Sequence, residues 1–141
     1  MAVNLTPHAL LFTLSAIGIS ESAYLIRARR AAEAPVCPIG HGCATVLSSR
    51  YNRLLPGLHN DILGLMFYLA MSALTALVVI LPVSPLWLQA AVFLLLAGAT
   101  VMSAILFILQ WRVIRAWCFW CLMSAGTIVL MDVIVLTAKL A

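Results

Sequence analysis

Four long apolar runs divide the 141-residue chain, and they constrain its fold more than any other feature. They cover about residues 9–26, 62–81, 86–110 and 117–140, and a helix needs roughly 20 mostly apolar residues to cross a bilayer. Hydrophobic residues make up 65% of the chain and charged residues only 9%, whereas soluble domains are about one quarter charged. We therefore predict an all-α integral membrane four-helix bundle that forms a single domain over residues 1–141.

The connection over residues 31–59 differs from the rest of the chain because it is mixed in composition and contains several prolines and glycines. It holds two of the four cysteines, Cys37 and Cys43, and long irregular connections often carry function. Within it, the spacing of apolar residues and arginines over residues 44–55 predicts a short amphipathic helix at the membrane interface. We therefore expect a redox loop with a short interfacial helix between the first and second spans.

The other two cysteines form a Cys118-Phe119-Trp120-Cys121 motif at the start of the fourth run. The loop follows the first span and the turn at 110–116 follows the third, so both lie on the same side of the membrane. Three tryptophans near this turn suit the headgroup level of a bilayer. All four cysteines are therefore expected at one membrane face.

The Cys-x-x-Cys motif has the setting of a reactive dithiol. At a helix N-terminus its sulfurs lie near the positive end of the helix dipole, and Arg115 adds positive charge, so both features favour the thiolate. A thiolate of low pKa attacks a disulfide and also leaves readily. We expect Cys118 to be the more exposed member of the motif, and Cys121 to face the bundle and a lipid-soluble oxidant such as a quinone.

Other interpretations of the cysteines stay open on these residues alone. Cysteine in a membrane helix is often a small apolar filler, and Cys37 and Cys43 could form a purely structural disulfide. Zinc could bind four thiolates with His41 as a spare ligand, but the C-x5-C spacing is unusual for such a site and we predict no metal. Structural cysteines would make the chain a non-enzymatic membrane subunit.

Two acidic residues, Glu21 and Asp132, fall inside apolar runs, where ionisable groups are candidates for function. For both we favour an interfacial or helix-pairing role over proton transfer.

The sequence resembles the vitamin K epoxide reductase family, in its single-domain form without a fused thioredoxin-like domain. The resemblance rests on the C-x5-C pair, the Cys-x-x-Cys motif and the runs from Cys43 to Tyr51 and from Asn60 to Tyr68. It implies a quinone-linked thiol-disulfide oxidoreductase that forms disulfide bonds. Its substrates would be a thioredoxin-like protein in trans and ubiquinone, menaquinone or a related quinone. The bacterial quinone-linked disulfide oxidase is a weaker match, because its two cysteine pairs occur in the opposite order.

The resemblance also implies a role for each cysteine. Cys37 would exchange with the thioredoxin-like partner and Cys43 with Cys118. Cys121 would react with the quinone.

The same resemblance assigns two polar residues to the quinone site. Asn60 would hydrogen-bond a quinone carbonyl, although it also suits the N-cap of the second span, and Ser49 would have a supporting polar role. Relatives that reduce vitamin K epoxide carry a tyrosine where this chain has Ala125. This departure favours ordinary quinone chemistry. Reduction of vitamin K epoxide is the alternative, with another aromatic residue lining the pocket: Tyr51, Tyr68 or Trp120.

The seven arginines all fall on the cysteine-bearing side of the predicted bundle, at positions 27, 29, 30, 50, 53, 112 and 115. They flank the apolar runs without forming an aromatic and basic surface, so they indicate topology and not nucleic-acid binding. The positive-inside rule then places the cysteines in the cytoplasm, whereas the family usually faces an oxidising exterior or lumen. We favour the inverted arrangement, in which cytoplasmic proteins are oxidised.

Overall fold

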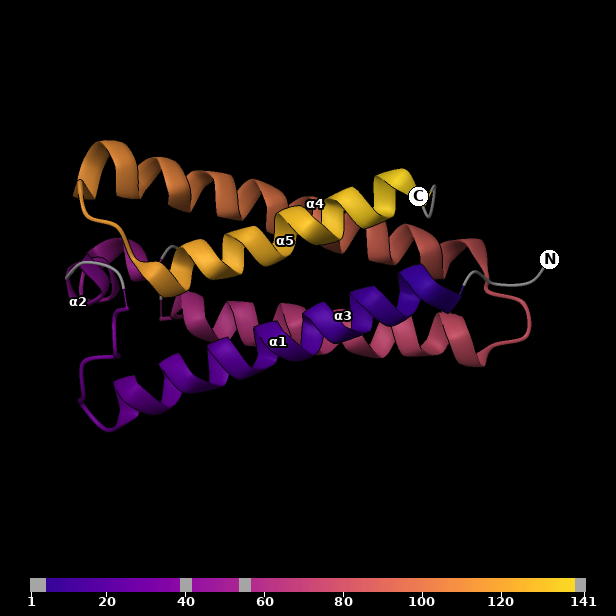
Figure 1. Cartoon of the computed structure of the whole chain (residues 1–141), viewed down its shortest axis with the longest axis horizontal. Coiled ribbons are helices and arrows are strands. Elements are labelled where there is room, and N and C mark those ends of the chain that lie inside the picture. Colours follow the sequence, from indigo (N-terminus) through magenta and orange to yellow (C-terminus); the bar gives the residue numbers. More distant parts are fainter. Residues whose placement is uncertain (1–4, 39–41, 54–56, 139–141) are drawn as a thin grey trace.

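The computed structural model describes residues 5–38, 42–53 and 57–138. Within them it contains four long helices, shown in Figure 1: α1 (Leu5–Arg30), α3 (Asn60–Ile80), α4 (Leu86–Ile108) and α5 (Phe119–Thr137). A π-helical turn, η2 (Leu109–Ile114), continues α4. Each of the four is long and apolar enough to cross a membrane. The predicted four-span, all-α fold is therefore confirmed.

The helices differ in extent from the apolar runs that predicted them. α1 continues to Arg30 although its apolar run ends near residue 26, because charged side chains at the membrane surface do not interrupt backbone hydrogen bonding. The third span continues through η2 to Ile114, four residues beyond the predicted end. Arg115 then adopts a left-handed conformation with φ 55°, which ends the helix and turns the chain towards α5.

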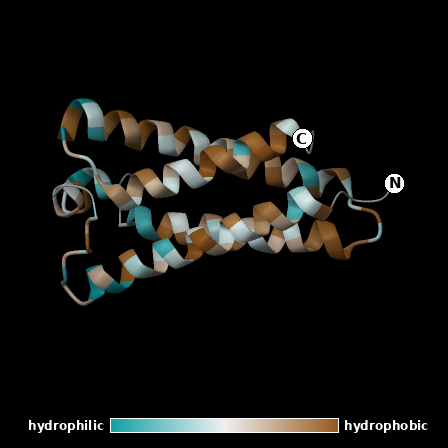
Figure 2. Cartoon of the chain, in the orientation of Figure 1, coloured by the Kyte–Doolittle hydropathy of each residue, from teal (hydrophilic) through white to brown (hydrophobic). Residues whose placement is uncertain are grey.

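Tyr68 of α3 joins three helices in the middle of the bundle. Its ring lies against Gly18 of α1, where a side chain would overlap it. Its hydroxyl oxygen lies 2.7 Å from the hydroxyl oxygen of Ser124 in α5. Apolar core residues surround it, while large hydrophobic side chains such as Leu94 and Leu136 remain exposed. Hydrophobic residues run along the helices and hydrophilic ones gather mainly towards their ends (Figure 2), as expected for a lipid-facing bundle.

A short helix lies between the first and second spans, as predicted, but the helical part of residues 44–55 is divided between α2 (Gly42–Leu47) and the 3₁₀ helix η1 (Arg50–Asn52). Ser48 and Ser49 separate them, and the hydroxyl of Ser49 donates to the carbonyl oxygen of Val46 at 2.7 Å. Residues 54–56 lie outside the described residues. α2 lies at the end of the bundle where α5 begins, and the start of α1 and the end of α5 lie at the opposite end (Figure 1).

Candidate active site

The four cysteines lie in one cluster at the α2 end of the bundle. Cys43 and Cys118 form its buried centre, with exposed fractions of 1% and 0%, and Cys37 and Cys121 pack against them. Cys37 and Cys43 form a disulfide, with their Cα atoms 6.0 Å apart, and Cys118 and Cys121 are free thiols. The structure thus brings the two pairs together, as the count of spans predicts.

The prediction that Cys118 is the more exposed cysteine of its motif is wrong, because the residue Cys118 is 0% exposed and Cys121 is only partly buried. α2 covers Cys118. The backbone of Gly42 lies directly against the backbone of Trp117, and a Cβ built on Gly42 would lie 2.8 Å from the Trp117 nitrogen and overlap its carbonyl oxygen. The missing side chain at Gly42 therefore lets α2 approach the segment before α5 and seat Cys43 in the same cluster as Cys118.

Cys118 is the N-cap of α5, and its backbone and sulfur are both held by neighbours. Its N–H donates to Oε1 of Gln110 at 2.9 Å, and its Sγ accepts from the N–H of Cys121 at 3.4 Å. A hydrogen bond from the Cys121 side chain, helped by the backbone N–H groups of Cys121 and Trp120, lowers the pKa of Cys118 against the opposing effect of burial. The pKa of Cys118 is therefore lowered, as predicted, but the largest cause is the Cys121 thiol and not the helix dipole or Arg115.

Gln110 was not among the predicted site residues. It lies in η2, is only 3% exposed, and fixes the backbone at Cys118 from eight residues away. Nothing in the sequence distinguishes it from an interfacial polar residue, because its role depends on the turn after η2, which brings the backbone of Cys118 within hydrogen-bond distance of its side chain.

Two aromatic side chains hold the loop immediately before Cys37. The N–H of Val36 donates to the hydroxyl of Tyr24 at 2.9 Å, and the Val36 carbonyl accepts from Nε1 of Trp120 at 2.6 Å. The rings of Tyr24 and Trp120 are themselves in contact, with centroids 4.8 Å apart. This aromatic clamp connects α1, the redox loop and the Cys-x-x-Cys motif. The sequence predicted a headgroup-level position for Trp120 and a possible place in the pocket lining, but not its hydrogen bond to the loop.

A cavity of about 80 Å³ lies beside Cys121, lined in part by Glu21, Asn60, Ser124 and Ala125. A larger groove of about 570 Å³ adjoins it between α3 and α4 and shares five of its lining residues: Asn60, Gly64, Ser103, Leu106 and Ser124. Exposed side chains such as Leu94 also line the groove, so it opens to the outside of the bundle. The cavity alone is smaller than the roughly 300–1,000 Å³ of typical small-molecule sites, but with the groove it falls in that range.

Asn60 is the first residue of α3, and His59 occupies the N-cap, so the N-cap interpretation of Asn60 is wrong. Its Nδ2 donates to the carbonyl oxygen of Tyr51 at 2.9 Å. Its Oδ1 is buried without a hydrogen-bond partner. The side chain lines both the cavity and the groove. Its Oδ1 can therefore accept a hydrogen bond from a ligand hydroxyl, and the second hydrogen on Nδ2 can donate to a ligand oxygen.

Ser49 lines a smaller pocket of about 30 Å³ together with Tyr51, Asn60 and Cys121. Its hydroxyl proton is used by the carbonyl of Val46, so it orders the break after α2. Among the aromatic residues considered as substitutes at the Ala125 position, Trp120 lines the cavity itself, while Tyr51 and Tyr68 line the pockets beside it.

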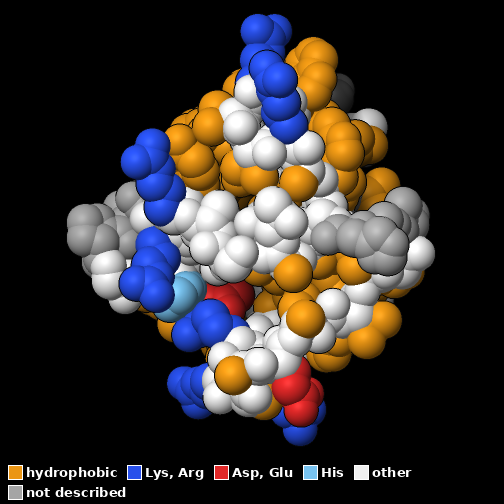
Figure 3. All heavy atoms as spheres, turned by 90° about the vertical axis from the view of Figure 1, so that its left-hand side faces the viewer, with side chains coloured by type: hydrophobic (Ala, Val, Ile, Leu, Met, Phe, Trp, Pro, Cys, Tyr) orange, Lys and Arg blue, Asp and Glu red, His pale blue; other side chains and the backbone are white. Residues whose placement is uncertain are grey.

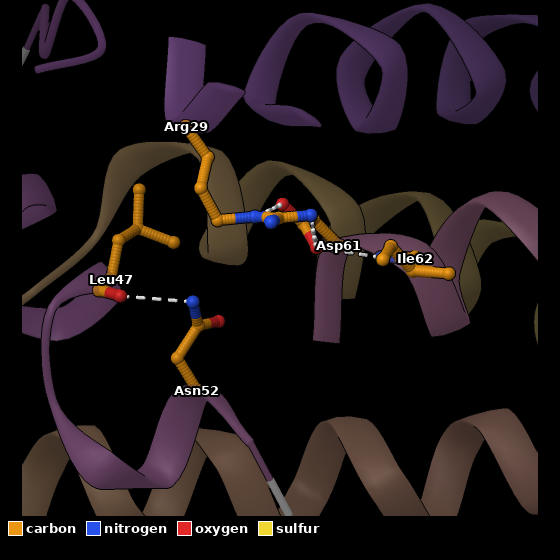
Figure 4. A network of polar contacts seen from close by, with 5 residues as sticks. All are labelled: Arg29, Leu47, Asn52, Asp61 and Ile62. Atoms are coloured by element: carbon orange, nitrogen blue, oxygen red, sulfur yellow. Dashed lines mark hydrogen bonds and ion pairs between the residues drawn. The ribbon is translucent and has the colours of Figure 1, made fainter. Parts of the chain in front are cut away.

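An ion pair holds α1 and α3 together next to the site. Nε of Arg29 lies 2.9 Å from Oδ2 of Asp61, and the other oxygen of Asp61 accepts from the N–H of Ile62 at 2.8 Å. Nearby, Nδ2 of Asn52 donates to the carbonyl oxygen of Leu47 at 2.9 Å and closes the turn after α2 (Figure 4). Basic side chains are spread over this end of the molecule (Figure 3).

The described residues contain no group of three or more His, Cys, Asp or Glu side chains that could hold a metal ion. His41, considered above as a spare zinc ligand, lies outside the described residues. Asp132 has the helix-pairing role that we predicted, because its carboxylate accepts from the hydroxyl of Thr100 in α4 at 2.8 Å.

The model of the vitamin K epoxide reductase family matches residues 9–136, which covers nearly the whole chain. A search of curated proteins found no significant match to the sequence.

Proposed function

Since the chain belongs to the vitamin K epoxide reductase family, we propose that it is a membrane thiol-disulfide oxidoreductase that oxidises a thioredoxin-like protein and reduces a quinone. The observation that carries this proposal is the cysteine cluster. Cys43 and Cys118 are buried in contact with the same apolar residues, while Cys121 borders a cavity that adjoins a groove open at the bundle surface. This arrangement suits electron transfer from a loop dithiol to a lipid-soluble acceptor.

The relay begins at the loop. A thiolate of the partner attacks Cys37, and a second partner thiol resolves the mixed disulfide, so the partner becomes oxidised and the loop pair becomes a dithiol. We assign Cys37 to this step because it is less buried than Cys43, which is 1% exposed. The aromatic clamp at Val36 supports this role by holding the backbone that precedes Cys37.

The second exchange takes place inside the protein. The Cys43 thiolate attacks the Cys118 sulfur of an oxidised Cys118–Cys121 pair and releases the Cys121 thiolate. Cys37 then attacks the sulfur of Cys43, which restores the loop disulfide and releases Cys118. In the structure the loop pair is a disulfide and the Cys-x-x-Cys pair is free, which corresponds to the stage after this exchange.

In the final step, the thiols of Cys118 and Cys121 form a disulfide, and two electrons and two protons reduce the quinone to a quinol. We place the quinone ring beside Cys121 and Asn60, where the amide of Asn60 can donate to the carbonyl oxygen on which negative charge develops. The apolar tail of the quinone would occupy the groove between α3 and α4. Ala125 supplies no phenol in the cavity, so we propose ordinary quinones and not vitamin K epoxide as the substrate.

Quinone reduction by the purified protein, with a reduced thioredoxin-like protein as donor, tests the proposal directly. Cys43→Ala and Cys121→Ala should both abolish turnover, while Val129→Ala, an exposed position on α5, should retain it. When the Cys-x-x-Cys pair is reduced chemically, Cys43→Ala should reduce one equivalent of quinone and Cys121→Ala should not. Parental turnover in both cysteine variants would show that the cysteines are structural.

We also propose that the cysteine-bearing face lies in the cytoplasm. The support is the distribution of the arginines, several of which line the open hollow beside α2, including Arg29, Arg50 and Arg53. After mild reduction, a membrane-impermeant maleimide should label Cys37 only in opened cells. Equal labelling in intact cells would place this face outside the cytoplasm.

A further inference from the structure

The cavity beside Cys121 contains a carboxyl group that the relay does not use. Glu21 of α1 is 7% exposed, lines the cavity together with Cys121 and Asn60, and its Oε2 is buried without a hydrogen-bond partner. It lies eight residues before Arg29, or roughly 12 Å deeper along the helix at 1.5 Å per residue. The carboxyl is therefore inside the apolar part of the span, at the same cavity as the reacting sulfur.

The other intramembrane carboxyl shows why this position is unusual. Asp132 is held by the hydroxyl of Thr100 on the neighbouring helix, which accounts for its presence in the bundle. Glu21 forms no ion pair with a basic residue in the described part of the chain, where the ion pair present joins Arg29 to Asp61. A buried carboxylate without a cation or a full set of donors is very costly, so such a group keeps its proton.

Quinone reduction creates a demand for protons at this place. Each turnover breaks two S–H bonds, forms one S–S bond and moves two electrons to the quinone, whose two oxygens must each gain a proton. The amide of Asn60 can stabilise charge on an oxygen but cannot supply a proton to it. A neutral carboxyl at the same cavity can do so, and it regains a proton when a cysteine thiol releases one.

We propose that Glu21 is the general acid that protonates one quinone oxygen while Cys121 and Cys118 deliver the electrons. This inference rests on the proposed function, because it requires a quinone in the cavity. It revises the interfacial or helix-pairing role that the sequence suggested for Glu21. The Cys-x-x-Cys thiols supply both protons overall, and Glu21 returns to its starting state after each cycle.

The ionisable groups that face Glu21 from the helices packed against α1 are Asp61 and Tyr68 of α3 and Cys121 of α5. Asp61 is paired with Arg29, and the hydroxyl of Tyr68 is engaged with Ser124. Both groups are thus engaged in other contacts, whereas Oε2 of Glu21 has no hydrogen-bond partner.

Single-turnover reduction of a short-chain ubiquinone analogue by the chemically reduced full-length protein tests this role. General acid catalysis contributes about 10²–10⁴-fold, so Glu21→Gln should slow quinone reduction at least a hundredfold, and Glu21→Asp should recover part of the loss. Asp132→Asn, which changes the other intramembrane carboxyl outside the cavity, should keep the parental rate. Thiol exchange between the loop pair and the Cys-x-x-Cys pair, followed by thiol labelling, should be unchanged in Glu21→Gln.

A parental rate of quinone reduction in Glu21→Gln would overturn the inference, and so would an equal loss of quinone reduction and of internal thiol exchange, which would indicate a structural role. Infrared difference spectra of the parental protein give a test that does not depend on folding of the variant. Addition of the quinone analogue should shift a protonated carboxyl band, and an unchanged carboxyl region would also refute the role. The proposed function fails separately, if the parental protein reduces no quinone.

Discussion

Gly42→Ala is the sharpest perturbation of the internal exchange, because it changes one atom at the contact between α2 and the segment before α5. The new Cβ would lie 2.8 Å from the nitrogen and 3.0 Å from the carbonyl carbon of Trp117, and it would overlap the carbonyl oxygen. Ordinary contact for a Cβ begins near 3.4 Å. Since 3.4 minus 2.8 is 0.6, α2 must retreat by at least about 0.6 Å, and the overlap with the oxygen demands more.

This retreat cannot be absorbed by a side-chain rotation, because the atoms that the Cβ meets belong to the Trp117 backbone. It moves Cys43 away from Cys118, whose own backbone is fixed by Gln110. Reacting groups misplaced by about 1 Å commonly react about a hundredfold more slowly. We therefore expect Gly42→Ala to slow the exchange between the loop dithiol and the oxidised Cys-x-x-Cys pair by about ten to a hundredfold.

Rapid mixing of the half-reduced protein, followed by acid quenching and mass spectrometry of labelled thiols, measures this exchange. Quinone reduction by a chemically reduced Cys-x-x-Cys pair should proceed at the parental rate in Gly42→Ala, because Gly42 does not line the cavity beside Cys121. Gly126→Ala is the matched control, since a Cβ there meets nothing within 4 Å. Parental exchange kinetics in Gly42→Ala would refute the claim that this backbone contact positions the two cysteines.

Three further perturbations address the clamp, the thiol chemistry and the ion pair. Trp120→Phe keeps an aromatic ring but loses the Nε1–H bond to the loop carbonyl, so oxidation of the thioredoxin-like partner should slow severalfold. A parental rate of partner oxidation would contradict the role of the clamp. The Cys121 side chain is the largest cause of the lowered pKa of Cys118, so Cys121→Ala should shift the pH profile of Cys118 alkylation by iodoacetamide to higher pH, because the thiolate then forms only at higher pH. Cys121→Ser keeps a donor and should shift it less, and identical profiles would refute this assignment. Arg29→Met leaves the buried Asp61 of α3 without its partner. Because Arg29 is partly exposed, we expect the unfolding free energy, measured by titration with a denaturing detergent, to fall by about 1–3 kcal/mol. A loss no larger than that of the exposed control Arg30→Met would contradict this prediction.

Hydropathy and the order of the cysteines determine the architecture without reference to the structure. Apolar runs of sufficient length must form helices in a bilayer, because unpaired backbone groups there are too costly. Counting four such spans then places the loop pair and the Cys-x-x-Cys pair at one face. These are local or topological properties, and the structure and the family match agree with them.

The detailed site depends on contacts between segments that are distant in sequence. The hydrogen bond from Trp120 to Val36 joins residues 84 positions apart, and the burial of Cys118 depends on α2 lying over it. The periodicity of a single helix cannot specify which of its residues a separate loop will cover. For this reason the sequence predicted the wrong member of the Cys-x-x-Cys pair as the more exposed one.

The two intramembrane acids also separate what the sequence determines from what only the tertiary structure decides. Glu21 and Asp132 are equivalent in the sequence, since each is an isolated carboxyl group in an apolar run, and the sequence determines only that each must avoid the lipid. Tertiary packing places a threonine hydroxyl against Asp132, and it leaves Oε2 of Glu21 unpartnered in the cavity beside Cys121. The cost of a buried carboxyl depends on what the neighbouring helices offer it, and only the folded bundle decides that.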